Sequence, residues 1–246
     1  MFEAIFDFFI KNSDIIVNYT LKVPAVMIAI LIHELAHSLA AYALGDPTAK
    51  EDGRLSLNPF KHIEPVGAVC LYLFNVGWTK PVSTNPKNFK NERLGIFFTS
   101  LAGPLANLLT FVLSFAFIML TTAIRASFLH FGMPGIWNTI LLYTINFLAL
   151  VALFNFVLGV FNLLPIFPLD GSRALMSIIP KRISKPIVRY ELFIAIGFIA
   201  LVVIDRFTFK FLDTSIGIAF DFLSNDVFIP FFEAPLVKIF SYFKLI

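Results

Sequence analysis

The sequence His33-Glu34-Leu35-Ala36-His37 lies inside an apolar run that extends from Val23 to Leu44. The run is 22 residues long, about 33 Å of α-helix, which is enough to cross a bilayer. Residues four apart share one face of a helix, so the imidazoles of His33 and His37 can bind a single metal ion. Ionisable groups are costly inside an apolar segment and usually serve a function there. The stretch therefore predicts a zinc site within a membrane, with Glu34 beside the metal as a candidate general base.

The composition of the chain agrees with a membrane protein. Hydrophobic residues make up 58% of the 246 residues and the mean hydropathy is +0.84, which few soluble domains tolerate. The single cysteine, Cys70, excludes an intrachain disulfide and a cysteine-rich zinc module. The formal net charge is only +3, so we do not expect nucleic acid as a partner.

Three further apolar windows predict additional membrane-spanning helices. The second window runs from Leu94 to about Ile124 and contains Gly103-Pro104, where we expect a kink or break. The third extends from Ile136 to Leu164 and ends at prolines that cannot continue a regular helix. The fourth covers roughly Ile187 to Ile204. Together the windows predict an all-α polytopic membrane protein.

The two ends of the chain predict less definite structure. Residues 1–22 carry apolar side chains at helical spacing and lack the basic start of a signal peptide, which favours an amphipathic segment on the membrane surface. Residues 206–246 are rich in Phe but contain several acidic residues, so they could span the membrane or lie at its interface. The core is therefore assigned to residues 23–205, and we expect about four to six spans in total.

Lysine and arginine alternate between few and many in the segments that connect the windows. Gly45–Arg93 carries seven and Arg173–Arg189 carries five, whereas the neighbouring segments carry one or two. The positive-inside rule then places these two basic segments in the cytoplasm and the amino terminus outside. By helical rise, His37 lies about 10 Å and His33 about 16 Å from the cytoplasmic end of the helix. We therefore expect the metal site of this cell-membrane protein to lie toward the cytoplasmic side.

The connection between the first two windows contains a second apolar element. Gly45-Asp46-Pro47 is typical of a helix end. Ile63–Trp78 is moderately apolar but too short to span, and its β-branched and aromatic residues favour a small cytoplasmic β-hairpin or a re-entrant element. An exposed strand edge there could hold an extended peptide by strand addition; an irregular loop is the alternative.

Catalytic zinc usually takes three protein ligands and keeps one position for water. By residue type His62 or Glu64 could be the third ligand, but both lie in a polar loop where solvated side chains are the simpler interpretation. His130 falls on the predicted opposite side of the membrane. Asp170 is the better candidate because it directly follows the third window. Two prolines before it and Gly171 after it predict a rigid turn that can aim the carboxylate inward.

At these residues the sequence resembles the site-2 proteases, a family of intramembrane zinc metalloproteases. The resemblance is carried by the motif at His33–His37 together with the N-x-x-P-x-x-P-L-D-G element at Asn162–Gly171. Ala102–Asn107 is similar to the GxxxN element of the family. Gly45–Pro47 and Gly77–Val82 are similar to its compact bacterial branch, which lacks PDZ and CBS domains.

The resemblance covers roughly residues 23 to 205 and implies a role for each matched residue. It implies that His33, His37 and Asp170 bind one zinc ion and that Glu34 activates the water. It also implies that Asn162 positions the substrate or stabilises the oxyanion. The implied partner, besides the lipid bilayer, is a membrane-anchored protein substrate whose spanning segment must unwind locally before cleavage. The oligomeric state is not indicated.

Several alternatives stay open from the sequence. Gly103 and Asn107 could support the catalytic site, or their spacing could reflect small-residue packing between helices with one interhelical hydrogen bond. A metal-handling membrane transporter could use the histidines as a transit site, but the second and fourth windows contain few polar residues. An inactive membrane-protein binder would have no need to retain Glu34 and Asp170.

Overall fold

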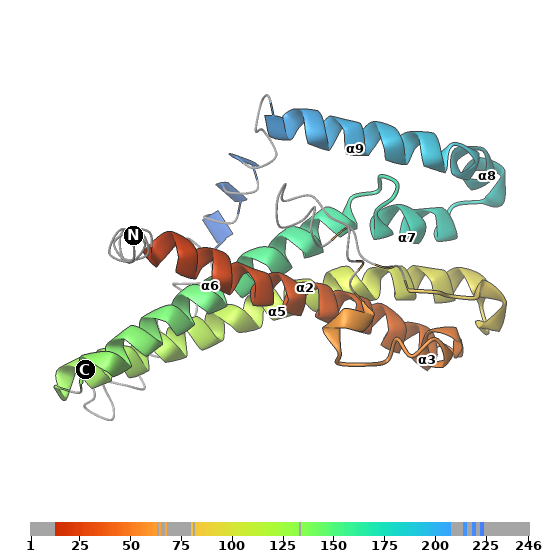
Figure 1. Ribbon diagram of the computed structural model, residues 1–246. Coiled ribbons are helices and arrows are strands. Elements are labelled where there is room, and N and C mark those ends of the chain that lie inside the picture. Colours follow the sequence, from red (N-terminus) through yellow and green to blue (C-terminus); the bar gives the residue numbers. More distant parts are fainter. Residues whose placement is uncertain are drawn as a thin grey trace, which may run out of the picture.

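The computed structural model describes residues 13–62, 64, 67, 80, 82–132 and 134–207, with short pieces at 214–215, 218–219 and 222–223. Its elements are helical (Figure 1). In chain order they are α2 (Ser13–Ala43), α3 (Thr48–Glu51), η1 (Pro59–Lys61), η2 (Pro86–Asn88), α5 (Glu92–His130), α6 (Gly135–Leu163), α7 (Asp170–Ile178), α8 (Lys181–Arg189) and α9 (Glu191–Phe207).

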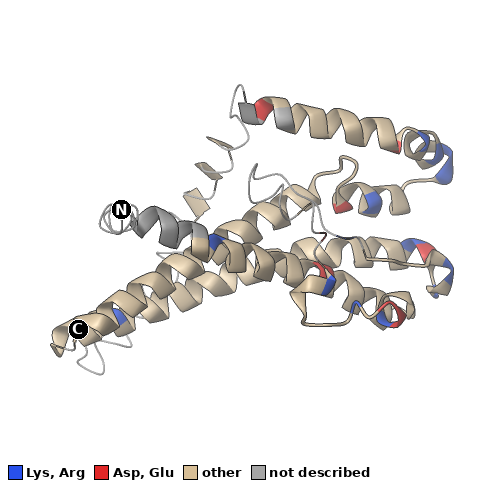
Figure 2. Ribbon diagram, viewed as in Figure 1, with Lys and Arg blue, Asp and Glu red and all other residues tan. Residues whose placement is uncertain are grey.

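Three of these helices are long and apolar enough to cross a membrane. They are Thr20–Ala43 within α2, the whole of α5 and the whole of α6. No strand occurs in the described part of the chain, which agrees with the predicted all-α architecture. The expected count of four to six spans is not confirmed, because only these three helices meet the length among the described residues. Most charged residues lie at one end of the molecule, around α3, α8 and the start of α5 (Figure 2).

Several predicted features lie wholly or mostly outside the described residues. They include the amphipathic segment up to residue 12, the hairpin or re-entrant element with Cys70, and most of the tail after residue 206. Residues 13–22 are helical and continuous with the first spanning helix. The first apolar window is therefore the second part of a longer helix.

Helix α2 ends at Ala43, as predicted from Gly45 shortly after it. Gly45 has a φ of 104°, a left-handed conformation that residues with a Cβ rarely adopt. This conformation lets the N–H of Gly45 reach the carbonyl of Tyr42 and the N–H of Asp46 reach the carbonyl of Ala41. The two bonds form a Schellman motif, which satisfies carbonyls at the end of the helix and turns the chain sharply.

Helix α5 runs through Gly103-Pro104 as one helix, so of the kink or break predicted there the break is wrong. Pro104 lacks the N–H that would bond the carbonyl one turn earlier. Its side chain is fully buried, and its carbonyl oxygen would lie 3.2 Å from a Cβ placed on Gly159 of α6. Close packing against α6 thus holds the backbone helical where the proline weakens it.

The structure confirms the predicted end of the third apolar window but divides the fourth window between two helices. Helix α6 ends at Leu163, directly before Pro165, as predicted. The fourth window is divided, because α8 ends at Arg189 and the apolar α9 begins only at Glu191. Arg189 belongs to the polar helix α8, and the described part of α9, Glu191–Phe207, has 17 residues, which is shorter than a typical span.

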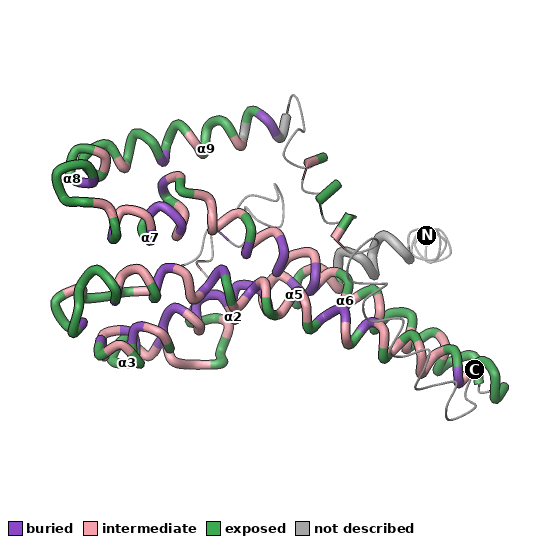
Figure 3. The backbone as a smooth tube through the Cα atoms, turned by 180° about the vertical axis from the view of Figure 1, so that it is seen from behind, coloured by how far each residue is buried: buried purple, intermediate pink, exposed green. Residues whose placement is uncertain are grey.

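The core lies where α2, α5 and α6 cross, and it is the most deeply buried part of the molecule (Figure 3). Phe111 and Phe115 of α5 pack against Ala152 and Phe156 of α6. On α2 small residues face the other helices, and Ala29 is fully buried. The outward face of α5 exposes large apolar side chains at helical spacing, as lipid contact permits: Leu105, Leu109, Leu113, Phe117 and Leu120.

Candidate metal centre

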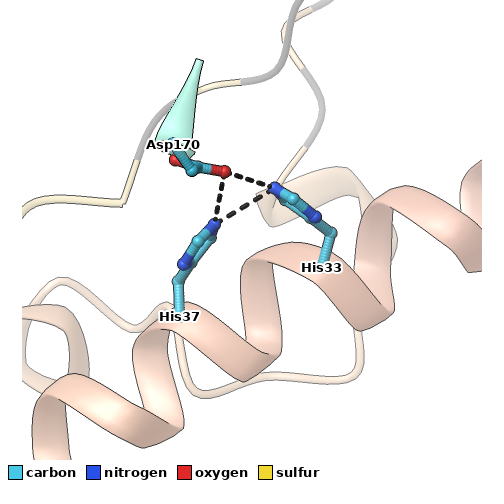
Figure 4. Close-up of side chains that lie close together, drawn as sticks. All are labelled: His33, His37 and Asp170. Carbon is cyan, nitrogen blue, oxygen red and sulfur yellow. Dashed lines mark hydrogen bonds and ion pairs between the residues drawn. The ribbon is translucent and has the colours of Figure 1, made fainter. Parts of the chain in front are cut away.

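The fold brings the three predicted metal ligands together. His33 and His37 project from one face of α2, and Asp170 reaches them from the first turn of α7 (Figure 4). The Oδ2 atom of Asp170 lies 3.0 Å from Nε2 of His33 and 3.1 Å from Nε2 of His37. The two Nε2 atoms are 3.1 Å apart. Three atoms that can each bind a metal therefore converge on one point.

Both imidazoles are oriented from behind by carbonyl oxygens of α5. The Nδ1 of His33 lies 3.2 Å from Oδ1 of Asn107, and the Nδ1 of His37 lies 2.7 Å from the backbone oxygen of Thr99. A carbonyl oxygen can only accept, so each Nδ1 must carry the proton. In the neutral imidazoles the Nε2 atoms then keep their lone pairs, which is the tautomer a metal requires.

The amide of Asn107 is itself fixed in one orientation. Its Nδ2 donates to the backbone oxygen of Ala29 on α2 at 3.3 Å, which leaves Oδ1 to face His33. Asn107 is fully buried. It therefore joins α5 to the histidine helix and accepts the proton of His33 Nδ1, which fits the supporting place predicted for it.

The convergent atoms fit a small cation. An ionised carboxylate oxygen and two imidazole nitrogens with free lone pairs repel one another when they lie about 3 Å apart, unless a cation or additional protons lie between them. Tetrahedral zinc with bonds of about 2.0–2.1 Å separates its ligands by about 3.3 Å, close to the spacing found here. Two imidazoles and one carboxylate also form one of the ligand sets known in catalytic zinc sites.

Gly103 makes room for the imidazoles. A Cβ added to it would lie 2.4 Å from Nε2 of His37 and 2.9 Å from Cε1 of His33. Such distances are below van der Waals contact, so only glycine fits at this point of α5. Gly103 and Asn107 are one helical turn apart on the same face. Gly103 lets α5 approach the imidazoles, and Asn107 bonds to His33. The two residues therefore contact the candidate ligands in addition to packing α5 against α2.

The turn between α6 and α7 carries Asp170 to the histidines. It contains Pro165 and Pro168, with a cis peptide bond before the second proline. A Cβ on Gly171 would lie 2.3 Å from the backbone oxygen of Leu163, so the glycine permits the close return of the chain. Burial raises the pKa of the Asp170 carboxyl, but hydrogen bonds and positive charge from the His33 and His37 imidazoles, which act when protons take the place of a metal at Nε2, lower it by more. The pKa therefore lies well below its usual range, and the side chain is a carboxylate, the form that binds metal.

The remaining candidate residues have different surroundings. Glu34 is 4% exposed and follows a ligand directly in the chain. Asn162 is half-buried, and its amide donates to the carbonyl of Leu158 in its own helix at 3.0 Å. His62 is fully buried and bonds to the carbonyl of Ser56 through Nε2, so the expected solvated loop position is wrong for it. It is nevertheless not part of the metal cluster found among the described residues.

Two residues have structural roles that the sequence did not indicate. Thr99 acts through its backbone oxygen, which every residue possesses, so no side-chain pattern could indicate it. Asp46 is fully buried after the end of α2. Its carboxylate accepts from the N–H and hydroxyl of Thr48 at 3.1 and 2.5 Å, from the Asn88 amide at 2.8 Å and from the Asn85 N–H at 2.7 Å. Asp46 thus ties the end of the histidine helix to the segment that leads into α5.

Comparison with known proteins agrees with this arrangement. The family model described as "Peptidase family M50" matches residues 22–204, which include all three candidate ligands. The protein described as "Putative zinc metalloprotease YwhC" of Bacillus subtilis (strain 168) is 34% identical over 182 residues. The aligned region covers 74% of this chain and 78% of that protein. No solved structure matches the chain.

Proposed function

Because the chain belongs to peptidase family M50, we propose that it is an intramembrane zinc metalloprotease of the site-2 type. It would hydrolyse a peptide bond in or near the spanning segment of a membrane-anchored protein. The observation that carries this proposal is the convergence of His33, His37 and Asp170 on one point between apolar helices. The same observation makes a metal transit site less suitable, since the imidazoles are fixed from behind by Asn107 and Thr99.

In this proposal His33, His37 and Asp170 hold one zinc ion per chain. When bound, zinc supplies Lewis acidity, which lowers the pKa of water and polarises a carbonyl group. The hydrogen bonds from the two Nδ1 atoms keep the imidazoles in the required tautomer and orientation. The carboxylate of Asp170 contributes negative charge, which offsets part of the charge of the dication.

Glu34 is the proposed general base and acid. Its carboxylate accepts a proton from the attacking water as the water oxygen bonds to the scissile carbonyl carbon. It then passes this proton to the leaving nitrogen as the carbon–nitrogen bond breaks. The atoms of one water are thus divided between the new carboxyl and the new amine. Burial of Glu34 keeps bulk water from competing for the proton.

Asn162 is the proposed group that positions the substrate or stabilises the oxyanion. It lies at the end of α6, one turn before the proline turn that carries Asp170. Its side-chain amide has two N–H groups, and one of them already donates to Leu158. The second could donate to a substrate carbonyl. A spanning substrate helix hides its peptide bonds in its own hydrogen bonds, so it must unwind before it can use this donor.

The proposed location is the cell membrane, with the metal centre toward the cytoplasm. Helices α2, α5 and α6 have the length and hydropathy of spans. The distribution of lysine and arginine along the sequence supports the orientation. Water would reach the centre from the cytoplasmic side.

The decisive experiment uses the full chain, purified in detergent, with Glu34→Gln as the test variant. Bound zinc and cleavage of a single-span model substrate are measured on the same preparation. The exposed Glu51→Gln is the matched control, because it makes the same chemical change away from the site. We expect Glu34→Gln to retain zinc near one per chain and to lose cleavage at least about 100-fold, the usual size of a general acid–base contribution.

The possible outcomes separate the alternatives. Zinc in wild type without cleavage by any preparation would favour a binding role over proteolysis. Cleavage that persists in Glu34→Gln would exclude Glu34 as the general base. A folded wild-type protein that binds no zinc would contradict the proposal as a whole.

A further inference from the structure

Helix α8 carries a group of basic side chains that the proposed catalytic site does not use. Lys181, Arg182, Lys185 and Arg189 form this group, which we call the α8 basic cluster. Together with Pro186 and Tyr190 they line an open depression of about 400 Å³. This volume falls in the range of sites for small molecules and headgroups.

The cluster occupies one flank of an amphipathic helix. At about 100° per residue, its four members fall within a sector of about 100° around the helix axis. All four are exposed. Ile183 lies about 100° further around the axis than Arg182, and Tyr190 lines the same depression directly after the helix. They are 56% and 55% exposed, so uncovered apolar surface lies beside the cationic flank.

The positive charge of the cluster is mostly uncompensated within the described part of the chain. Lys181 faces Glu92 at 4.0 Å, and both side chains are largely exposed, so this ion pair is weak. Arg182, Lys185 and Arg189 have no acidic partner among the described residues. The cluster therefore attracts an anion from outside this part of the chain.

The position of α8 coincides with the boundary between charged and apolar sequence. Glu92 and Arg93 are the last charged residues before the uncharged stretch 94–124 of α5. Glu191 is likewise followed by uncharged residues up to 204 in α9. Helix α8 contacts the start of both helices, through the Lys181–Glu92 pair and through the chain at Tyr190. Figure 2 shows its basic residues at the end of the molecule where charges gather.

We propose that the α8 basic cluster binds the phosphate of an anionic phospholipid headgroup. The inference rests on the membrane location given under the proposed function, but not on catalysis. A soluble phosphate would satisfy only the cationic flank. A phospholipid also supplies an apolar layer for Ile183 and Tyr190 just beyond its phosphate, so it alone matches both flanks. Bound there, the lipid would hold α8, and with it the adjoining end of α7, at the membrane surface.

The test measures lipid binding to the full-length protein in detergent by native mass spectrometry. The probe is a short-chain phosphatidylglycerol, compared with phosphatidylcholine of the same chain length. The test variant is Arg182→Gln/Lys185→Gln/Arg189→Gln. The matched control, Lys87→Gln/Lys90→Gln/Arg93→Gln, removes the same charge from exposed positions before and at the start of α5.

We expect wild type and control to prefer phosphatidylglycerol and the α8 variant to bind it at least about tenfold more weakly, since each basic residue near an anionic surface adds a severalfold gain. Unchanged zinc content in the variant separates this result from any failure of the metal centre. If the triple variant melts at lower temperature, Lys185→Gln and Arg189→Gln are measured singly, with a severalfold loss expected for each.

Three results would overturn the proposal. Equal losses in the α8 variant and the control would show diffuse electrostatic attraction and no site. Equal affinity for phosphatidylcholine would remove the role of the anion. Displacement of the lipid by inorganic phosphate or by a polyglutamate peptide at the same concentration would identify a soluble anion or an acidic protein segment as the occupant.

Discussion

His33 and Asn107, which lie on different helices, share a buried hydrogen bond of 3.2 Å between Nδ1 and Oδ1. This bond determines which nitrogen of His33 faces the metal position. It also makes the geometry of the centre depend on how α5 packs against α2. A polar residue inside a helix pair that could have served only packing thus bonds directly to a candidate metal ligand.

Replacing Asn107 should therefore weaken zinc binding. Asn107→Ala removes the acceptor for His33, and we expect the affinity for zinc to fall by about 10- to 100-fold, as for other residues that orient metal ligands. Competition with a chelator of known affinity measures it. Asn155→Ala is the control, because Asn155 is equally buried but donates to Val151 in its own helix. Equal zinc loss in both variants would assign the effect to general loosening of the helices.

A single methyl group at position 103 should damage the centre. The Cβ of Gly103→Ala would lie 2.4 Å from Nε2 of His37, so either the imidazole or α5 must move. We expect zinc affinity to fall at least about tenfold and cleavage to fall with it. Gly197→Ala is the control, since a Cβ there meets nothing within 4 Å and should leave both unchanged. Normal zinc binding by Gly103→Ala would show that the close approach found here is not needed.

The sequence predicted the three long apolar helices and the three side chains that the fold brings together, because both depend on local pattern. Helical periodicity places His33 beside His37, and prolines end α6 directly before the turn that carries Asp170. The pairing of Asn107 with His33 was left open, since spacing alone cannot tell a helix-packing contact from a metal-site contact. Only the relative position of α2 and α5 separates the two.

Other features could not be predicted from local pattern. Thr99 bonds to His37 through its backbone oxygen, so this contact cannot be recognised from the residue type. The uninterrupted helix at Pro104 depends on its burial against α6, a tertiary effect that overrides the local preference. The fourth window began at Ile187, but its first residues belong to α8, and a helix boundary at Tyr190 is not visible in hydrophobicity alone.

Asp46 should be important for stability without touching the metal. Asp46→Ala leaves the N–H groups of Thr48 and Asn85 and the Asn88 amide without their shared acceptor, and we expect a loss of about 3 kcal/mol in the free energy of unfolding. Thermal or denaturant unfolding in detergent measures it. Asp52→Ala, an exposed change of the same kind nearby, should have little effect.

The contribution of Asp46 should also depend on pH. Burial raises the pKa of its carboxyl, but hydrogen bonds from Thr48, Asn88 and Asn85 lower this pKa by more than burial raises it. The pKa in the folded protein therefore lies below the unfolded value. The stabilisation is then fully present above about pH 4, the unfolded pKa, and is lost as the pH falls through the folded pKa. The stability difference between wild type and Asp46→Asn should shrink below about pH 4. A difference that grows on acidification would contradict this assignment.

Asn162 provides the sharpest test of how the substrate is held, because its one side-chain bond lies within its own helix. Asn162→Ala should retain zinc and fold normally, and lose cleavage by about 100-fold if its free N–H stabilises the oxyanion. Asn162→Asp keeps the size but removes the donor, so the same loss is expected. A fall in kcat in both variants identifies the donor role, and a rise in KM alone identifies substrate positioning. Full activity in both would remove Asn162 from the catalytic machinery and leave the oxyanion to the metal centre.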